Sequence, residues 1–521
     1  MAVDDNKPNE VNASGHAQEL DRQFGLLSIS AVGIVTGCSW ALMGGTIVTS
    51  VLNGGPPGIL YEFIAVSVMY CFVAASIAEL ASAMPSSAGV YQWSAMVSGT
   101  RYGPMVSFYA GWWNTLAWIF ATVSSGSVVA QQAVQMYALF HPEYTFQRWH
   151  VFVTYIAVTW MCCFVVAYAN RALPWINHVG LFFIIAGVLI SILVCAIMPS
   201  RHASNAFVWR DWENETGYSS NGMVFVMGML NGAYAMGTPD CASHLAEEIP
   251  RPNVNVPKAI AAQIIIGFLS TFLYLLALLY AISDINAVVE SSFNFPLAQI
   301  YLQATGSQAG ALGLLIVIFL PSLCACVAAY ITAGRVLWTL GRDGATPFSK
   351  IVGKIDTRQK NPLNSTIICG IISTAFGGIY MGSETAFNAF VGSFVILMSL
   401  SYIAALGPHL FQRRHTVMRG PFWIKGTAGY VVGGISCAYL IVFIVIFCFP
   451  YTMPTSATSM NYSSAITGGI TILVTGWWLW KRKTDYVGPQ MVVMNPVVPD
   501  NRPGSMEIDA HDVFDGSVVK K

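Results

Sequence analysis

The chain has 521 residues, of which 55% are hydrophobic and 10% are charged, and its formal net charge is zero. An ordinary soluble domain carries about 25% charged residues, whereas windows such as 102–142 and 149–170 contain none and could cross a hydrocarbon layer of roughly 30 Å. The composition therefore predicts an all-α integral membrane protein. It argues against a soluble enzyme, and we expect no nucleic acid partner.

The first 23 residues are polar and acidic-leaning, without the basic start and apolar run of a cleavable signal peptide. We expect a cytosolic N-terminal tail at 1–23, a twelve-helix domain at 24–483 and a cytosolic C-terminal tail at 484–521. The eleven cysteines lie inside apolar stretches or at the end of one, where they pack as small apolar side chains. No disulfide, metal site or cofactor is predicted.

Apolar windows between charged or Pro/Gly-rich breaks predict twelve membrane-spanning helices. An even number of spans places both tails on the same side of the membrane. The approximate limits are 26–51, 58–83, 104–137, 150–170, 174–199, 222–244, 258–283, 309–340, 363–381, 385–410, 429–451 and 462–481.

Basic residues indicate which side the tails occupy, because they concentrate in cytoplasmic loops. If both tails are inside, the inner segments hold most of the arginines and lysines, and the outer loops hold only Arg148, Arg201 and Arg210. We therefore predict that both termini are cytoplasmic. The outer loop at 200–221 then contains Asn214, in the sequence Asn-Glu-Thr, as a candidate glycan acceptor.

The first and sixth spans differ from the others because glycine and polar residues gather in their middle. They read "SISAVGIVTGCSWALMGGTIV" and "VFVMGMLNGAYAMGTPD". In a single span, such glycines often mean only close packing against a neighbouring helix. The two lie five spans apart, which divides the chain into repeats at about 26–199 and 222–410 and additional helices at about 429–481. Because five is odd, the repeats have opposite orientations, as in transporters in which two discontinuous helices meet at a substrate site.

Acidic residues mark the predicted cytoplasmic exit of the sixth span. Asp240 is the acid nearest to either break, and we expect it a turn or more towards the cytosol. Glu247 and Glu248 begin a proline-rich inner loop, where they should reach water. We expect these acids to form an interfacial salt bridge with Arg251, Lys258 or Arg101. Proton coupling through Glu247 is the less favoured alternative.

Other ionisable residues inside spans are functional candidates because a charge within a bilayer is costly. Glu62 and Arg335 lie close enough to the predicted interfaces to reach water along the membrane surface. Glu79 is the better candidate for a proton relay.

Several stretches resemble the fungal amino acid/choline permeases, including 4-aminobutyrate (GABA) permease-like members, of the amino acid, polyamine and organocation superfamily. They are "GGPPGILYEFI", "ASIAELASAMPSSAGVYQWSAMV", "GTPDCASHLAEEIPRPNVNVPKAI", "FPLAQIYLQATGS" and "GRDGATPFS", and the similarity covers roughly residues 20–485. The resemblance implies a five-plus-five inverted repeat with broken helices one and six. It also implies uptake of choline, 4-aminobutyrate, other amino acids or polyamines across the plasma membrane.

Carried over position by position, the resemblance implies a substrate cradle in the two broken segments and gating elements beside them. In the inner segment after span two, Glu79 and Tyr91 match gating or structural positions, and Asp240 and Glu247 are further candidates for coupling. The expected cradle residues are Gly33, Thr36, Gly37, Cys38 and Ser39 in span one, and Asn231, Gly232, Tyr234 and Gly237 in span six.

We therefore expect a secondary active permease that imports a small amine-containing solute by alternating access, with the proton as coupling ion and membrane lipid as its surroundings. A non-transporting nutrient sensor of the same fold is the alternative. Aromatic residues such as Trp118 and Tyr234 suit a quaternary ammonium by cation–π attraction, but a belt or packing role is the favoured explanation for each of them. A site without an acid at either break fits a zwitterion better than a polyamine, so the solute stays open.

Overall fold

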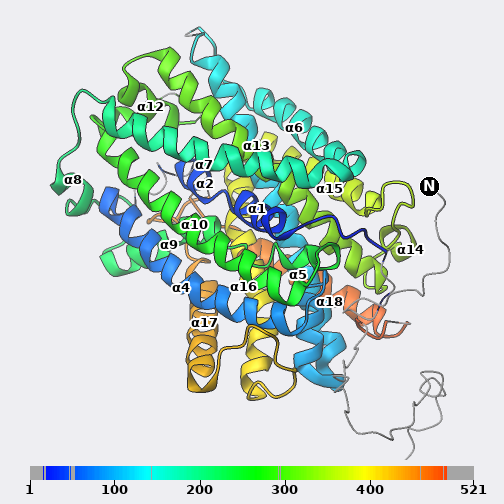
Figure 1. Cartoon of the computed structure of the whole chain (residues 1–521). Coiled ribbons are helices and arrows are strands. Elements are labelled where there is room, and N and C mark those ends of the chain that lie inside the picture. The colour runs from blue at the N-terminus through cyan, green and yellow to red at the C-terminus, as the bar shows by residue number, and fades with distance from the viewer. Residues whose placement is uncertain are drawn as a thin grey trace, which may run out of the picture.

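The computed structural model is an all-helical bundle (Figure 1) that describes residues 16, 19–45, 47, 53–141, 143–291, 293, 295–457, 459–484 and 486–489. The tails predicted at 1–23 and 484–521 lie largely outside these residues. Within the described ranges no β-strand forms, and two isolated bridge pairs are the only β-type contacts. The predicted all-α class is confirmed.

The helices of the first predicted repeat follow the expected order. The first span is divided into two helices, and a kink at Gly99 (φ 70°) separates the inner start of the third span from its membrane part. The helices are α1 (Leu26–Gly37), α2 (Ser39–Gly45), α4 (Gly55–Ala83), α5 (Val90–Ala138), α6 (Arg148–Tyr168) and α7 (Leu173–Ile197).

The second half contains seven long helices and several short connecting ones. The long helices are α9 (Asn221–Met236), α10 (Pro252–Ala281), α13 (Gln308–Arg342), α15 (Leu363–Gly382), α16 (Glu384–Phe411), α17 (Gly426–Ile446) and α18 (Ser463–Lys481). The connectors are η1 (Asn170–Ala172), α8 (Asn205–Trp209), η2 (Ser243–Glu248), α11 (Ile285–Val289), α12 (Leu297–Thr305) and α14 (Ser349–Val352).

Nine helical segments among the described residues are long and apolar enough to cross a membrane. The helices α5, α9 and α18 complete the twelve predicted spans, but they are shorter or less apolar than those nine. The chain is thus a multi-pass membrane protein. Its division into repeats at 26–199 and 222–410 stays a prediction.

Local sequence explains where several helices begin. Gly54 adopts a left-handed conformation (φ 99°), and α4 then starts with a proline in its first turn, where the missing N–H has no intrahelical partner to lose. The Ser307 hydroxyl accepts a hydrogen bond from the Gly310 N–H at 3.1 Å and caps α13. Turns and caps thus place the helix ends at the edges of the bundle.

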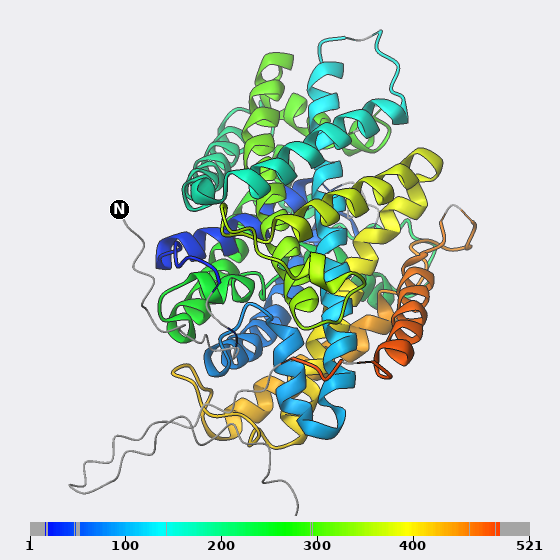
Figure 2. The same ribbon diagram turned by 90° about the vertical axis from the view of Figure 1, so that its right-hand side faces the viewer.

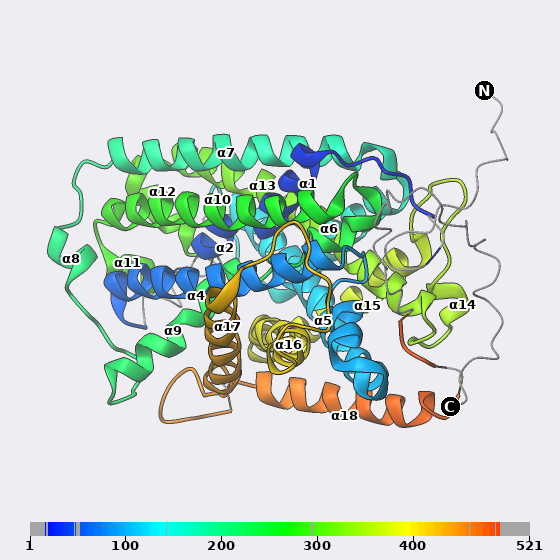
Figure 3. The same ribbon diagram turned by 60° about the horizontal axis from the view of Figure 1, so that its bottom comes forward.

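Helices far apart in the sequence pack together around the bundle centre. The helix α5 runs along both α13 and α16, whereas α4 contacts α9, α10 and α17. Figure 3 shows α7 along one side of the bundle and α18 along the opposite side, and Figure 2 places α18 at its outer edge. This arrangement leaves the divided first span and the C-terminal half of α9 in the interior, where they can form a site.

Candidate substrate site

Both predicted helix interruptions are present. The helix α1 ends at Gly37, Cys38 takes a left-handed conformation (φ 30°, ψ 41°), and α2 starts at Ser39. The helix α9 ends at Met236, and the chain continues without α-helical winding as far as η2. The Ser39 hydroxyl donates a hydrogen bond to the carbonyl oxygen of Ala235 at 3.0 Å, so the two interruptions lie side by side.

A small cavity lies between the two interruptions and the helices α5, α13 and α16. Its volume is about 30 Å³, room for about two water molecules at roughly 10–15 Å³ each. A solute the size of choline or an amino acid therefore requires the surrounding helices to move apart. The lining residues are Thr36, Gly37, Leu42, Trp118, Ala121, Ser125, Tyr234, Thr238, Ala325, Ala329 and Phe394.

Three aromatic side chains form the walls of this cavity. The rings of Tyr234 and Phe394 meet edge to face, with their centroids 5.6 Å apart. The Tyr234 hydroxyl donates to the Ser124 hydroxyl oxygen at 2.7 Å, and the indole N–H of Trp118 donates to Asp240 at 3.3 Å. Each polar group of these rings is thus used by the protein, which leaves their faces for contact with a solute.

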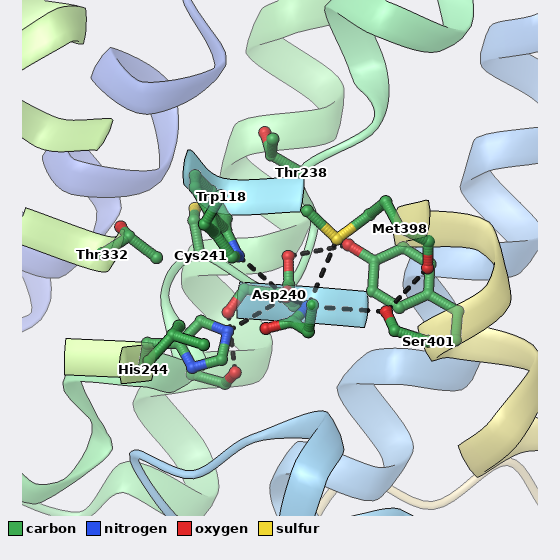
Figure 4. Close-up of polar contacts among 12 residues, drawn as sticks. Trp118, Thr238, Asp240, Cys241, His244, Thr332, Met398 and Ser401 are labelled. Carbon is green, nitrogen blue, oxygen red and sulfur yellow. Dashed lines mark hydrogen bonds and ion pairs between the residues drawn. The ribbon is translucent and has the colours of Figure 1, made fainter. Parts of the chain in front are cut away.

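A buried carboxylate, that of Asp240, organises the second interruption (Figure 4). Besides Trp118, it accepts hydrogen bonds from the Asn114 amide at 2.8 Å and the Tyr402 hydroxyl at 2.7 Å, and it pairs with His244 at 3.0 Å. Its side chain is fully buried. The expectation that Asp240 lies a turn or more beyond the break is wrong, because the winding of α9 stops only at Met236 and Asp240 lies within the unwound segment that follows.

The Asp240 carboxylate differs from a typical binding acid because protein donors already satisfy it. Four donors from α5, α16 and η2 share its two oxygens, and a buried charge is tolerated when it is paired and hydrogen-bonded in this way. The group therefore holds the unwound segment in place and orients Trp118. Because protein donors occupy both of its oxygens, neither oxygen is left for the ammonium group of a solute.

A residue that the sequence did not single out, Gln263 on α10, joins the two interruptions. Its amide nitrogen donates to the carbonyl oxygen of Thr238 at 3.0 Å, and its amide oxygen accepts from the Cys241 thiol at 3.3 Å. A Cβ on Gly33 or Gly37 would lie 3.3–3.4 Å from the same side chain. The signal was present, since Gln263 is an isolated amide in the apolar stretch "AIAAQIIIGF".

Some predicted cradle residues meet at the cavity. Thr36, Gly37 and Tyr234 line it, whereas Cys38 and Ser39 form the turn directly beside it. The Thr36 hydroxyl is buried and has no hydrogen-bond partner among the described residues, so it is available to a solute.

Other predicted cradle residues lie elsewhere. Gly33, Asn231 and Gly232 are inside continuous helical turns, so the expectation that Asn231 and Gly232 unwind the sixth span is wrong. A Cβ on Gly232 would lie 2.3 Å from Val66, which explains this glycine by close packing against α4. Gly237 follows the end of α9, and its carbonyl oxygen accepts a hydrogen bond from the Tyr402 hydroxyl at 3.2 Å.

The residues proposed for gating form buried contacts on the predicted cytoplasmic side. Glu79 pairs with Arg414 at 2.6 Å and with His409 at 3.3 Å. The Tyr91 hydroxyl shares a hydrogen bond of 3.0 Å with the Tyr486 hydroxyl. Glu79 is therefore a partner in a buried ion pair, and its role as a proton relay stays a prediction.

The Glu247/Glu248 pair is also buried, and the expected salt bridges with Arg251, Lys258 or Arg101 are wrong. Glu247 pairs with Arg342 at 3.2 Å, and Glu248 accepts hydrogen bonds from Arg335, including one of 3.0 Å from Nη2. Arg335 is itself fully buried, contrary to the expectation that it reaches water. The reason is that η2 folds inward against α13, which brings the acids to basic residues about 90 positions later in the chain.

The candidate glycan acceptor lies in a structured turn. The Asn214 amide nitrogen donates to the carbonyl oxygen of Tyr218 at 2.7 Å, and its amide oxygen accepts from the Thr216 hydroxyl at 2.7 Å. Glycosylation at Asn214 stays a prediction, and it would replace one of the two hydrogens on this amide nitrogen.

Comparisons with known proteins agree with the fold. A family model described as amino acid permease matches residues 24–474. The choline transporter of Saccharomyces cerevisiae is 30% identical over 485 residues, which cover 93% of this chain and 86% of the relative. Amino-acid permease BAT1 of Arabidopsis thaliana is 27% identical, with 91% of this chain and 94% of the relative covered.

Two further comparisons extend this similarity. The 7-keto 8-aminopelargonic acid transporter of Saccharomyces cerevisiae is 26% identical, with 89% of this chain and 93% of the relative covered. A manganese transporter variant from Eremococcus coleocola has a similar fold, with a TM-score of 0.57, 16% identity and coverage of 88% and 94%. The sequence prediction of a permease rather than an enzyme is confirmed, and the chain belongs to the amino acid permease family of membrane transporters.

Proposed function

We propose that this permease imports a small solute with a cationic amine head across the plasma membrane by alternating access, and that the head binds in the cavity between the two helix interruptions. The aromatic walls of that cavity are the observation on which the proposal depends. Trp118, Tyr234 and Phe394 line it together with the C-terminal end of α1. Aromatic faces attract ammonium groups, and helix C-termini carry partial negative charge.

The charge around the cavity narrows the class of solute. Among the described residues that line it there is no basic or acidic side chain, and Asp240 behind Trp118 is already satisfied. A polyamine would need a second free carboxylate, so a solute with one ammonium group fits better. The 30% identical choline transporter supports choline as the first compound to test, with amino acids and 4-aminobutyrate next.

Buried ion pairs support alternating access. Glu248 with Arg335 and Glu247 with Arg342 join the segment after α9 to α13, on the predicted cytoplasmic side of the cavity. With a cavity of about 30 Å³ above them, this arrangement supports a state that is closed towards the cytosol. Opening towards the cytosol then requires η2 to separate from α13. The paired side chains must then find other partners or become hydrated.

Uptake measured in yeast cells that lack their own choline and amino acid permeases tests the proposal. We would compare radiolabelled choline, 4-aminobutyrate, neutral and aromatic amino acids and spermidine, with and without a protonophore. The expected result is saturable uptake of a single-ammonium solute that the protonophore lowers. Normal surface expression without uptake of any of these solutes would contradict the proposal and favour the nutrient-sensor alternative.

A variant pair in α16 tests the cavity itself. Phe394→Leu removes an aromatic wall with little change in volume, so the apparent affinity for an ammonium solute should fall about tenfold or more, since cation–π attraction in a desolvated site is worth about 2 kcal/mol. Phe390→Leu is the matched control, because Phe390 packs on Phe120 and Phe376 away from the cavity. Equal apparent affinity for the solute in both variants would indicate that the solute binds outside this cavity.

A further inference from the structure

A buried acid with an unusual environment lies outside the cavity. Glu62 sits two turns into α4, about 10 Å along the helix from Gly55 at a rise of roughly 1.5 Å per residue, and it is 2% exposed. Its Oε1 accepts one hydrogen bond, from the Asn53 amide at 3.2 Å. This corrects the expectation that Glu62 reaches water at the membrane surface.

The other buried acids in the described part of the chain have cationic or ionisable nitrogen partners. Glu79, Asp240, Glu247 and Glu248 each contact an Arg or His within ion-pair distance. Glu62 has no Arg, Lys or His partner among the described residues. An ionised carboxylate without a counter-ion is costly in such a place, so the packed arrangement suits the neutral, protonated acid.

The carboxyl of Glu62 lies directly against the backbone of α9, which contacts α4 along this seam (Figure 3). A Cβ on Gly228 would lie 2.2 Å from the Glu62 carboxyl carbon and 2.1 Å from the Asn53 amide nitrogen. Asn53 also donates to the carbonyl oxygen of Val224 at 2.9 Å. The Glu62 carboxyl thus lies against α9, the helix whose end forms the second interruption.

A pocket lies next to this group on the predicted outer side, although Glu62 itself does not line it. This pocket of about 110 Å³ is lined by Asn53, Gly228 and Asn231, with Tyr451 and Asn461 opposite. Two of its lining residues, Asn53 and Gly228, are those that contact Glu62. We call this space the outer pocket.

We propose that Glu62 is the group that binds the coupling proton, which it receives from water in the outer pocket. This rests on the proposed function, and it replaces the candidates Glu79, Asp240 and Glu247, whose charges are already paired. A hydronium ion in the outer pocket gives its proton to the carboxylate, which becomes neutral and packs against Gly228. When α9 shifts and water reaches the group from inside, the proton leaves as hydronium and the carboxylate reforms.

The surroundings of Glu62 contain few other groups that titrate. Along α9, α8 and α17 no Asp, Glu, Lys, Arg or His occurs, and the nearest titratable residue of α4 is Tyr61, whose hydroxyl donates to the Trp209 carbonyl oxygen. The helix α16 brings His409, which pairs with Glu79 towards the other end of α4, and Tyr451 lines the outer pocket. The Lys258 of α10 lies at that helix's opposite, predicted cytoplasmic end. The covering loop contributes exposed charges, namely Arg210, Asp211, Glu213 and Glu215.

The test uses the full chain in proteoliposomes with the solute identified by uptake, and it separates exchange from proton-driven accumulation. One proton per solute moving down a gradient of one pH unit sustains about a tenfold accumulation. Glu62→Gln mimics the neutral acid, so counterflow exchange should stay within about twofold of wild type, while accumulation falls to the level without a gradient. Glu213→Gln, an exposed acid of the covering loop, should accumulate normally.

The outcomes are distinguishable. Absence of counterflow in the wild-type protein would overturn the proposed function itself. With wild-type counterflow present, accumulation by folded Glu62→Gln, or loss of its exchange together with accumulation, would overturn the role of Glu62. If Glu62→Gln does not fold, Gly228→Ala keeps the acid but displaces it from α9, so the pH dependence of uptake should shift; an unchanged pH profile would overturn the proposal.

Discussion

The two helix interruptions are built in different ways, although both expose backbone near the same cavity. The first is a single left-handed residue, Cys38, between two short helices that contain no charged side chain. The second is a longer unwound segment held by the buried Asp240 and its four donors. The comparison indicates that the first interruption is set by local backbone conformation and the second by long-range polar contacts.

The largest expected effect comes from removing the charge that holds the second interruption. We expect Asp240→Asn to lower the free energy of unfolding by about 3 kcal/mol and to abolish uptake, because hydrogen bonds to a charged group contribute roughly 1.5–3 kcal/mol each. Thermal unfolding in detergent and uptake per surface molecule measure this. The control Asp284→Asn alters an exposed helix cap and should change neither the free energy of unfolding nor the uptake appreciably. Equal losses in the two variants would contradict the role of Asp240 in holding the second interruption.

A second change tests the space at the same interruption. A Cβ on Gly237 would lie 2.5 Å from the Ala233 carbonyl oxygen, so Gly237→Ala should cost about 1–3 kcal/mol, as overpacking usually does, and lower uptake strongly. Gly378→Ala on α15, where nothing lies within 4 Å, serves as the control in the same uptake assay. Wild-type uptake by Gly237→Ala would show that the segment is looser than its contacts indicate.

The first interruption should respond to backbone preference rather than to charge. Cys38→Val places a β-branched residue at φ 30°, at a cost of about 1–2 kcal/mol, whereas Cys38→Gly relieves the left-handed conformation. We expect Cys38→Gly to transport within about twofold of wild type and Cys38→Val to transport less. Faster transport by Cys38→Val than by Cys38→Gly would show that local backbone conformation does not cause this break.

The smallest expected effect concerns the hydrogen bond between the interruptions. Ser39→Ala removes the donor to the Ala235 carbonyl oxygen, and it should lower the free energy of unfolding by about 0.5–1.5 kcal/mol, the usual value for one hydrogen bond. Thermal unfolding of the purified variant measures the change. A loss as large as that of Asp240→Asn would mean that the two breaks form one cooperative unit.

The sequence predicted that spans one and six are interrupted, but it placed the second break too early. Glycine has two roles in a membrane helix, and a one-dimensional pattern does not separate close packing from unwinding. Gly228 and Gly232 pack against Glu62 and Val66 of α4, while the winding stops at Met236. That distinction depends on which helix lies opposite, which is a tertiary property.

The ion-pair partners of the charged residues also could not be predicted from the sequence. Basic and acidic residues could be counted and assigned to predicted inner segments, yet Glu248 pairs with Arg335 and Glu79 with Arg414, across 87 and 335 positions. Likewise, three of the four donors to Asp240 come from α5 and α16, which meet only in the folded bundle. Charge pattern predicts the side of the membrane, and packing decides the pairs.

The central claim is that a single-ammonium solute binds between the two interruptions, against Trp118, Tyr234 and Phe394. Cryo-electron microscopy of the purified permease with the best transported solute tests it most directly. We expect solute density in an enlarged cavity bounded by Thr36 and these three rings. Density in the outer pocket beside Asn231, with the space between the interruptions still closed, would contradict it.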